Sequence, residues 1–195
     1  MTNKLFFAAL AATALVPAAA HAQRVPAAVV VVVDTDRIGS ECTACRSASA
    51  QLQTQTNNLR TRAQTLQTQL QTEGKPIQTA FEALKGKQPD AALQARITAF
   101  QTKERNAQQE LATAQRNLQS TQAHVNQQIG ARLQTIIASV AQQRGANLAL
   151  DKGNTAWAGP SVDVTNDVLA QLNQQLPAVS VTPLPQAQQQ QPQGR

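Results

Sequence analysis

The chain has few of the large side chains that fill a protein core. Of its 195 residues only 3% are aromatic, and tyrosine is absent. Gln, Ala and Thr are abundant instead, which suits long helices but not a thick hydrophobic core. The shortage of aromatics also disfavours a surface that stacks nucleic-acid bases. The composition therefore predicts an elongated or oligomeric molecule, and nucleic acid is not a predicted partner.

Residues with catalytic or metal-binding chemistry are also scarce. Only two histidines and two cysteines occur, and glycine-rich phosphate loops are absent. One of the histidines, His124, lies in a helical segment without a ligand or base partner nearby. Asp34 and Asp36 end an apolar run, where we interpret Asp36 as a structural or helix-capping residue. We therefore expect no catalytic residue, no metal and no cofactor, and a protein that is not an enzyme.

Long apolar runs are missing everywhere except near the N-terminus. There, Lys4 precedes an apolar run over residues 5–16 that is too short to span a bilayer comfortably. Ala20 and Ala22 then form an A-x-A cleavage pattern. The sequence predicts a signal peptide over residues 1–22, cleaved after Ala22, and a mature protein outside the cytoplasm.

Residues 27–33 are two alanines followed by five valines, and Asp34 comes next. Valine is stiff at χ1 and favours a pleated strand over a helix. An apolar run without alternation indicates a strand that is covered on both faces. We assign residues 23–42, together with residues 141–176, to a discontinuous β-body.

Residues 43–140 carry a heptad pattern typical of a coiled coil. The first seam has leucine at every seventh position, and a companion series runs beside it: Leu52, Leu59, Leu66; Thr56, Ala63, Leu70, Ile77, Leu84. Glu73 occupies a position where an apolar residue is expected. Gly74 and Pro76 lie in the same stretch and should bend or locally break the helix.

A turn near residues 86–91 divides this region into two helical legs. Gly86 can adopt the left-handed conformation that ends a helix, and Asp90 can cap the next one. Two legs of about 40 residues form an antiparallel hairpin about 60 Å long. The second leg becomes more apolar toward its end, where it should pack on the β-body.

Two short strands are predicted after the second leg, at residues 147–150 and 155–158, with turn residues between them. Trp157 in the latter strand is expected to be buried in the β-body. Thr165 is the predicted cap of a final helix. The Pro- and Gln-rich residues 177–195 are predicted to be disordered.

Three short blocks of this layout resemble the Skp (OmpH-like) family of periplasmic chaperones. They are an apolar strand ending in V-D-x-x-R-I, a block ending in A-N-L-A-L-D-K and a block similar to P-S-x-D-[IV]-T-x-x-V, at residues 32–38, 140–152 and 161–168. The likeness covers roughly residues 28–175, but its specificity lies in these end blocks rather than in the Gln-rich hairpin. The Cys42/Cys45 pair, the Gly74–Pro76 interruption and the Gln-rich tail depart from the family pattern.

The resemblance implies an α+β fold in which a helical hairpin, or tentacle, projects from a small β-body that assembles as a homotrimer. Unfolded outer-membrane proteins would be held between three such arms in the periplasm, without ATP. The expected oligomerisation residues are the strand residues and the nearby tryptophan: Val30, Val31, Val32, Val33, Leu148, Leu150 and Trp157.

Cys42 and Cys45 are three residues apart at the predicted start of a helix. In an oxidising compartment such a pair can close a disulfide, which is the preferred interpretation. A redox site, pairing between subunits and two free thiols remain alternatives. The redox alternative lacks the βαβ setting of thioredoxin-like proteins.

The predicted arm is basic, because residues 46–128 hold ten Lys or Arg and five Asp or Glu. This excess favours acidic clients and attraction to an anionic lipid or lipopolysaccharide surface. The candidate client-binding residues are the cations of the two legs: Arg60, Arg62, Lys75, Lys85, Lys87, Arg96, Lys103, Arg105 and Arg116. The alternative is that they only keep the helices soluble, in a structural coiled-coil spacer or envelope tether without chaperone activity.

Overall fold

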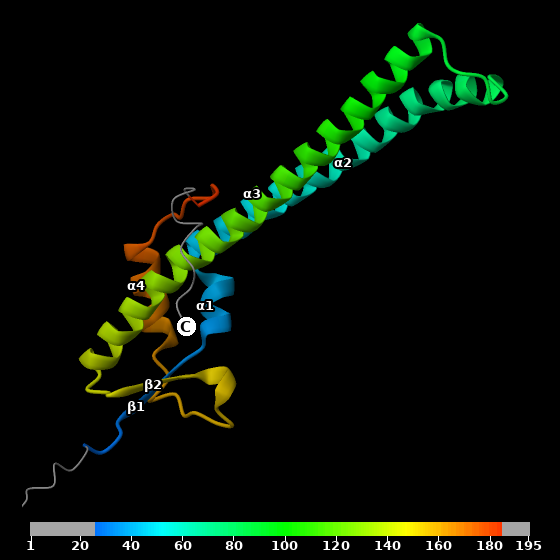
Figure 1. Cartoon of the computed structure of the whole chain (residues 1–195). Coiled ribbons are helices and arrows are strands. Elements are labelled where there is room, and N and C mark those ends of the chain that lie inside the picture. Colours follow the sequence, from blue (N-terminus) through cyan, green and yellow to red (C-terminus); the bar gives the residue numbers. More distant parts are fainter. Residues whose placement is uncertain (1–25, 185–195) are drawn as a thin grey trace, which may run out of the picture.

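The computed structural model describes residues 26–184, so the predicted signal peptide and the last part of the tail lie outside the described residues. A small body stands at one end of the molecule, and two long helices extend from it (Figure 1). We call residues 26–42 and 141–176 the body and residues 43–140 the arm. The elements, in chain order, are β1 (Val30–Val33), α1 (Thr35–Glu41), α2 (Thr43–Ala83), α3 (Ala91–Gln143), β2 (Leu148–Asp151), the 3-10 turn η1 (Lys152–Asn154) and α4 (Thr165–Gln175).

The sheet of the body has two parallel strands. β1 pairs with β2 in the register Val30 to Leu148 through Val33 to Asp151. On the other edge of β1, the Val32 N–H donates to the Val162 carbonyl at 2.8 Å, and its carbonyl accepts from the Val164 N–H at 2.9 Å. Residues 162–164 therefore cover that edge, and the valines of β1 after Val30 are buried.

The predicted strand at residues 155–158 does not form. Asp151 accepts a hydrogen bond from the Gly153 N–H at 2.7 Å, which closes the 3-10 turn η1 instead of a hairpin turn. A hairpin strand would lie beside β2, but among the described residues β2 pairs only with β1. Trp157 is consequently 84% exposed, so its predicted burial is wrong within a single chain.

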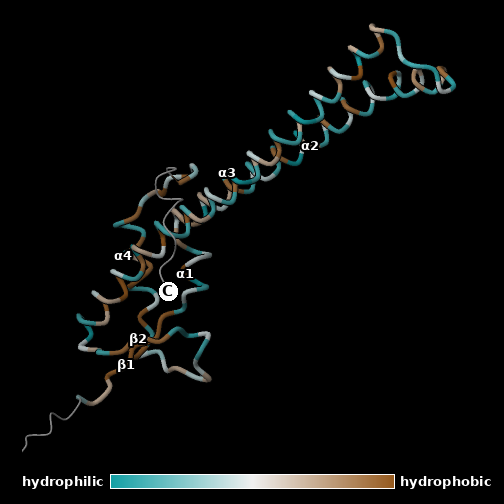
Figure 2. Tube along the Cα trace, in the orientation of Figure 1, coloured by the Kyte–Doolittle hydropathy of each residue, from teal (hydrophilic) through white to brown (hydrophobic). Residues whose placement is uncertain are grey.

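The core of the body lies where four helices meet behind β1. Figure 2 shows the hydrophobic segments gathered around β1 and β2, whereas the arm is mixed along its length. The fully buried side chains come from α1, from Cys42 between α1 and α2, from the end of α3 and from α4: Ile38, Cys42, Ile136, Val140, Val168 and Leu172. The apolar end of α3 thus joins the arm to the body, as its sequence predicted.

The two long helices α2 and α3 lie side by side and run in opposite directions (Figure 1). Gly86, with φ of 88°, follows α2, and Asp90 caps α3 by accepting from the Leu93 N–H at 2.7 Å. Helix α2 continues unbroken through Pro76. The predicted local break therefore does not occur. Near the tip of the arm α2 diverges from α3 (Figure 1).

Two helix caps differ from their predictions. Asp34, rather than Asp36, caps α1, because its carboxylate accepts from the Arg37 N–H at 2.9 Å. Thr165 is the first residue of α4 and not its cap. Its hydroxyl oxygen instead accepts from the Asp34 N–H at 2.9 Å. The Asp34 cap is a local contact, whereas a tertiary contact with Asp34 takes the Thr165 hydroxyl.

The predicted disorder from residue 177 onward is wrong for residues 177–184. These residues are neither helix nor strand, yet they lie against the root of the arm. Val179 and Val181 pack on apolar side chains of α2 and α3, and polar side chains of both helices bind the backbone. The composition of residues 177–184 suggested too few apolar side chains for an ordered segment. The apolar side chains of the arm supply the missing contacts. We call residues 177–184 the strap.

Candidate functional site on the helical arm

All three sequence blocks that carry the family resemblance contribute side chains to one polar network in the body. Thr165 donates to the Asp163 carboxylate through its N–H at 3.0 Å and its hydroxyl at 2.5 Å. Lys152 donates to the same carboxylate at 2.9 Å and lies 4.0 Å from Asp34. The motif residues therefore tie β1, η1 and α4 together. Their role is structural.

The charges of this network are fixed by hydrogen bonds. The Thr165 hydroxyl, followed by Lys152 and the Thr165 N–H, lowers the pKa of Asp163 to about 2. The Thr35 hydroxyl and then the Gly153 N–H lower the pKa of Asp151. Both carboxyls are ionised near neutral pH, so neither is poised as a general acid. Among residues 26–184, no group of three or more His, Cys, Asp or Glu could hold a metal ion.

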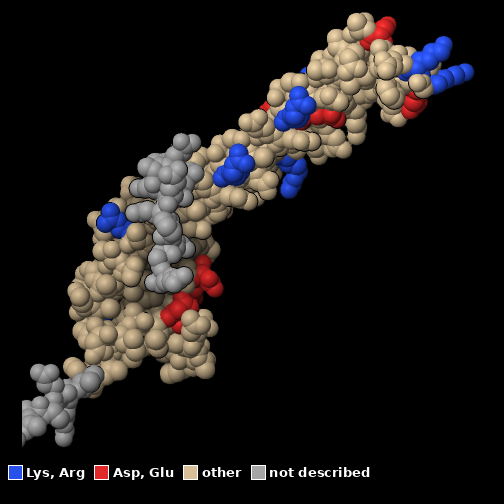
Figure 3. Space-filling view, viewed as in Figure 1, with Lys and Arg blue, Asp and Glu red and all other residues tan. Residues whose placement is uncertain are grey.

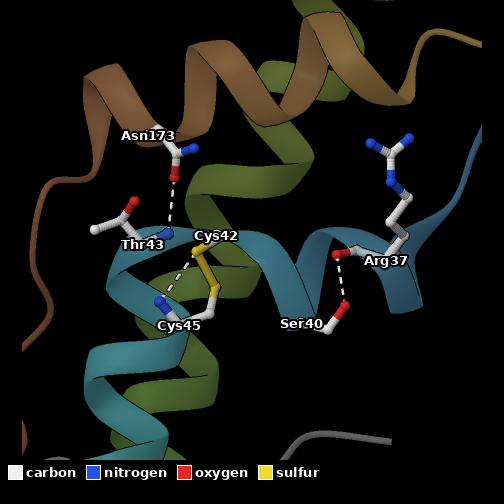
Figure 4. Close-up of a disulfide and its surroundings, with 6 residues drawn as sticks. All are labelled: Arg37, Ser40, Cys42, Thr43, Cys45 and Asn173. Carbon is white, nitrogen blue, oxygen red and sulfur yellow. Dashed lines mark hydrogen bonds between the residues drawn. A yellow bond between two sulfur atoms is a disulfide. The ribbon is translucent and has the colours of Figure 1, made fainter.

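The two cysteines form a disulfide at the junction of body and arm (Figure 4). Cys42 ends α1 and has no exposed surface, and Cys45 lies in the first turn of α2. Between them, the Thr43 N–H donates to the Asn173 side chain of α4 at 2.8 Å. The disulfide thus fixes the angle at which α2 leaves the body. Its burial leaves little access for a redox partner.

Charge is divided between the two parts of the molecule. The arm has eleven Lys or Arg and five Asp or Glu, a net +6, while residues 26–42 and 141–176 have three and six, a net −3. Figure 3 shows cations distributed along the arm to its tip and an acidic cluster on the body. The arm is therefore the electropositive part of the molecule.

The nine predicted client-binding cations are not equivalent. Arg62 forms a two-bond ion pair with Glu110 of α3, at 2.6 and 3.0 Å. Lys103 of α3 pairs in the same way with Glu73, at 2.5 and 2.6 Å. This explains the charged residue in the α2 seam. The other seven form no ion pair with a described residue: Arg60, Lys75, Lys85, Lys87, Arg96, Arg105 and Arg116.

An open apolar groove lies on the distal half of the arm, between α2 and α3. It has a volume of about 690 Å³ and is lined mainly by aliphatic and aromatic side chains, with Lys75 among the lining residues. Phe81 remains 55% exposed there. Gly74 allows Phe100 to approach α2 closely, because a Cβ atom at residue 74 would lie 2.9 Å from the Phe100 ring. We call this the distal groove, lined by Leu70, Gln71, Gly74, Lys75, Ile77, Gln78, Phe81, Ile97 and Phe100.

Sequence reasoning did not identify the distal groove as a site. The available signal was the distribution of phenylalanine: two of the four lie in the predicted signal peptide, and the other two are Phe81 and Phe100. These two residues are 19 positions apart on opposite sides of the turn. A hairpin therefore places them on facing helices. Heptad counting assigned Phe100 to the seam and left Phe81 unassigned.

Comparison with known families agrees with this architecture. A family model described as outer membrane protein (OmpH-like) matches residues 29–172. The chain belongs to the OmpH-like family. Among solved structures, the chain is similar to an OmpH-like protein of Caulobacter crescentus CB15 that is described as a candidate outer membrane chaperone. The TM-score is 0.66 at 21% identity, over 82% of this chain and 92% of that one. No curated protein matches the sequence.

The OmpH-like match includes most of the body, the disulfide and the whole arm, and it ends before the strap. The α+β class is confirmed, since this OmpH-like chain is mostly helical with one small sheet. Within residues 26–184, no helix combines the length and hydropathy needed to cross a bilayer.

Proposed function

We propose that this OmpH-like protein is a periplasmic holdase chaperone that binds unfolded outer-membrane proteins on its arms without ATP. The distal groove carries the proposal: both phenylalanines of the described chain line an open apolar surface on a positively charged arm. Such a surface suits segments that are still apolar and unfolded. Membership of the family and the predicted signal peptide support the same role and the periplasmic location.

The proposal includes assembly as a homotrimer through the body. A two-stranded parallel sheet is marginal by itself, because parallel sheets are normally covered on both sides. Here Val29, Leu148, Leu150 and Trp157 are 40 to 84% exposed on or beside that sheet. Copies of the same chain would cover these residues and leave the arms projecting around a shared space. The predicted oligomerisation residues Leu148, Leu150 and Trp157 are thus available at the surface.

Holding in this arrangement results from many weak contacts. Each groove offers a few apolar contacts, and several arms acting together raise the effective concentration of binding surface around one client. The client leaves when folding into the outer membrane is more favourable than staying bound. The same positive arms would attract an anionic lipid or lipopolysaccharide surface, where release takes place.

The test is dilution of a urea-unfolded outer-membrane β-barrel protein into buffer with the mature protein, followed by light scattering. A holdase suppresses scattering at near-stoichiometric amounts, and its affinity falls as salt rises, because screening weakens the attraction of the arms. A spacer or tether leaves scattering unchanged. Suppression that is insensitive to salt would overturn the electrostatic part of the proposal.

Two double variants of equal charge change sharpen this test. Lys75→Gln with Arg96→Gln removes two cations that have no ion-pair partner among described residues. Arg62→Gln with Lys103→Gln removes two that already face Glu110 and Glu73. At physiological salt the Debye length is about 8 Å, so local charge dominates. We expect the first pair to weaken client binding more than the second, and equal losses would contradict a role for the unpaired cations.

A further inference from the structure

The strap lies on the root of the arm in the way that an extended peptide lies in a binding site. Val179 and Val181 pack on Ala48, Leu52 and Val125 of the arm. Exposure alternates along the strap, with these valines half-buried and the residues between and beside them, Ser180 and Thr182, exposed. Alternation with a period of two is the signature of an extended chain that presents one face to a surface.

Arm side chains bind the backbone of the strap through five hydrogen bonds. The Gln128 side chain of α3 forms two hydrogen bonds with the Ser180 backbone. It donates to the carbonyl at 3.0 Å and accepts from the N–H at 2.9 Å. Gln55 of α2 donates to the Val181 carbonyl at 3.1 Å. The Leu184 N–H donates to Ser120 at 2.9 Å.

The fifth bond joins His124 Nδ1 to the Thr182 carbonyl at 3.0 Å. A carbonyl oxygen only accepts, so Nδ1 carries the proton in this arrangement. We call the surface made by Ala48, Leu52, Gln55, Ser120, His124, Val125 and Gln128 the root groove. It holds a peptide by its N–H and C=O groups and by two apolar side chains at alternate positions.

This mode of recognition is tolerant of sequence. Main-chain hydrogen bonds supply affinity, as when a peptide adds to the edge of a sheet. The shallow apolar contacts require only that apolar side chains occur at alternate positions. Strands of outer-membrane β-barrels alternate apolar and polar residues over about ten positions. The Val-Ser-Val-Thr run of the strap has the same alternation.

We propose that the root groove is a second client site, which takes an extended segment with apolar residues at alternate positions, and that the strap occupies it as an internal competitor. This inference rests on the proposed holdase function and assigns it a second site and a means of control. In the free protein the strap covers the groove. A client segment displaces the strap, and the strap returns when the client leaves.

When the strap covers the root groove, the apparent Kd for a competing peptide equals the intrinsic Kd divided by the fraction of molecules in which the groove is open. If the strap is docked in about four of every five molecules, the apparent Kd for a competing peptide rises about fivefold. Freeing the strap should recover that factor. The test uses a labelled peptide with the sequence of residues 177–184, whose binding to the full mature protein is measured by fluorescence anisotropy.

Val181→Asp places a charge against Leu52 and Val125 and should release the strap. Ala178→Asp is the matched control, because Ala178 is exposed and outside the root groove. We expect the peptide to bind the Val181→Asp protein about fivefold more tightly than the wild type or the control. Equal affinity for all three, or no binding to any, would overturn the inference. Should Val181→Asp fail to fold, a chain ending at Ala178 provides the same comparison.

A second pair of variants tests the groove itself. Gln128→Ala in the strap-released background removes both bonds to the peptide backbone and should weaken peptide binding, whereas Gln127→Ala, at an exposed neighbouring position, should not. Equal effects of the two would contradict the assigned groove. If the wild type prevents aggregation of the β-barrel client but the strap variants do not change peptide affinity, only this inference fails. If aggregation is unaffected throughout, the holdase function fails instead.

Discussion

At the scale of single residues, the body depends on a few polar side chains that each make several bonds. The Thr165 hydroxyl accepts from the Asp34 N–H while it donates to Asp163, so one oxygen joins β1 to α4. Asp163 also holds Lys152. A change at either residue therefore leaves other partly buried groups without a partner, which costs more than the lost bond alone.

The lowered pKa of Asp163 predicts an acid-sensitive body. A carboxyl whose pKa is lower in the folded state than its ordinary value of 3.8 stabilises the fold above pH of about 4. That contribution is lost as the pH falls toward 2, where the folded carboxyl takes up its proton. Because the side chain is 22% exposed, its contribution is about 1 kcal/mol. Urea unfolding of the wild type and of Asp163→Asn from pH 2 to pH 7 checks this.

The two proteins should differ in free energy of unfolding at pH 7 and converge toward pH 2. Asp36→Asn is the control, because its side chain is exposed in the first turn of α1 and forms no ion pair with a described residue. A constant difference between wild type and Asp163→Asn at every pH would show that charge at residue 163 does not matter.

At the scale of elements, the arm is held together by a thin seam rather than by a core. Most of its side chains are exposed, and buried ones such as Leu66 and Ala107 recur only at intervals. The Arg62–Glu110 and Lys103–Glu73 pairs are solvent-exposed and each contribute little to stability. They do select the alignment of α2 against α3. The close contact of Gly74 with Phe100 adds a second constraint on that alignment.

Two glycines of the arm should respond differently to substitution by alanine. Gly130 of α3 has open space around its Cα, so Gly130→Ala should raise the free energy of unfolding by about 0.5–1 kcal/mol through helix propensity. Gly74→Ala should gain less or lose stability, because the new methyl would meet the Phe100 ring at 2.9 Å. Urea unfolding of both variants measures this. A similar gain at both sites would contradict the close packing at the distal groove.

At the scale of the whole molecule, the body and the arm carry opposite charge and different kinds of exposed apolar surface. The body is acidic and exposes a compact patch beside its sheet, which suits copies of the same chain. The arm is basic and exposes the distal groove, which suits changing partners. In the proposed trimer, separating the two surfaces by the length of a helix would let the body assemble while the arm stays open.

Assembly should therefore be visible at Trp157, the sole tryptophan of the chain. It is 84% exposed in a single chain. If copies of the chain cover it, fluorescence emission should shift to the blue as concentration rises, in step with a trimer mass in sedimentation. Leu150→Asp should abolish both changes, while Leu84→Asp, near the tip of the arm, should leave them intact. A trimer whose Trp157 emission stays that of an exposed indole would place the interface elsewhere.

The sequence by itself determined the elements whose signals are local. Heptad spacing and the Gly86 and Asp90 signals located the long helices and their turn, and the valine run located β1. Short-range rules apply there because each residue needs only its neighbours along the helix or strand. The pair Cys42 and Cys45 was recognisable for the same reason, being one helical turn apart.

Only the tertiary structure decided the features that depend on competition between distant segments. Residues 162–164 took the other edge of β1, and residues 152–154 closed a 3-10 turn, so residues 155–158 formed no strand beside β2 and Trp157 remained exposed. The strap became ordered because α2 and α3 supply both its apolar floor and its hydrogen-bond partners. Phe81 and Phe100 became one groove because the hairpin brings them together. A local pattern cannot rank such contacts, since their free energy belongs to both segments at once.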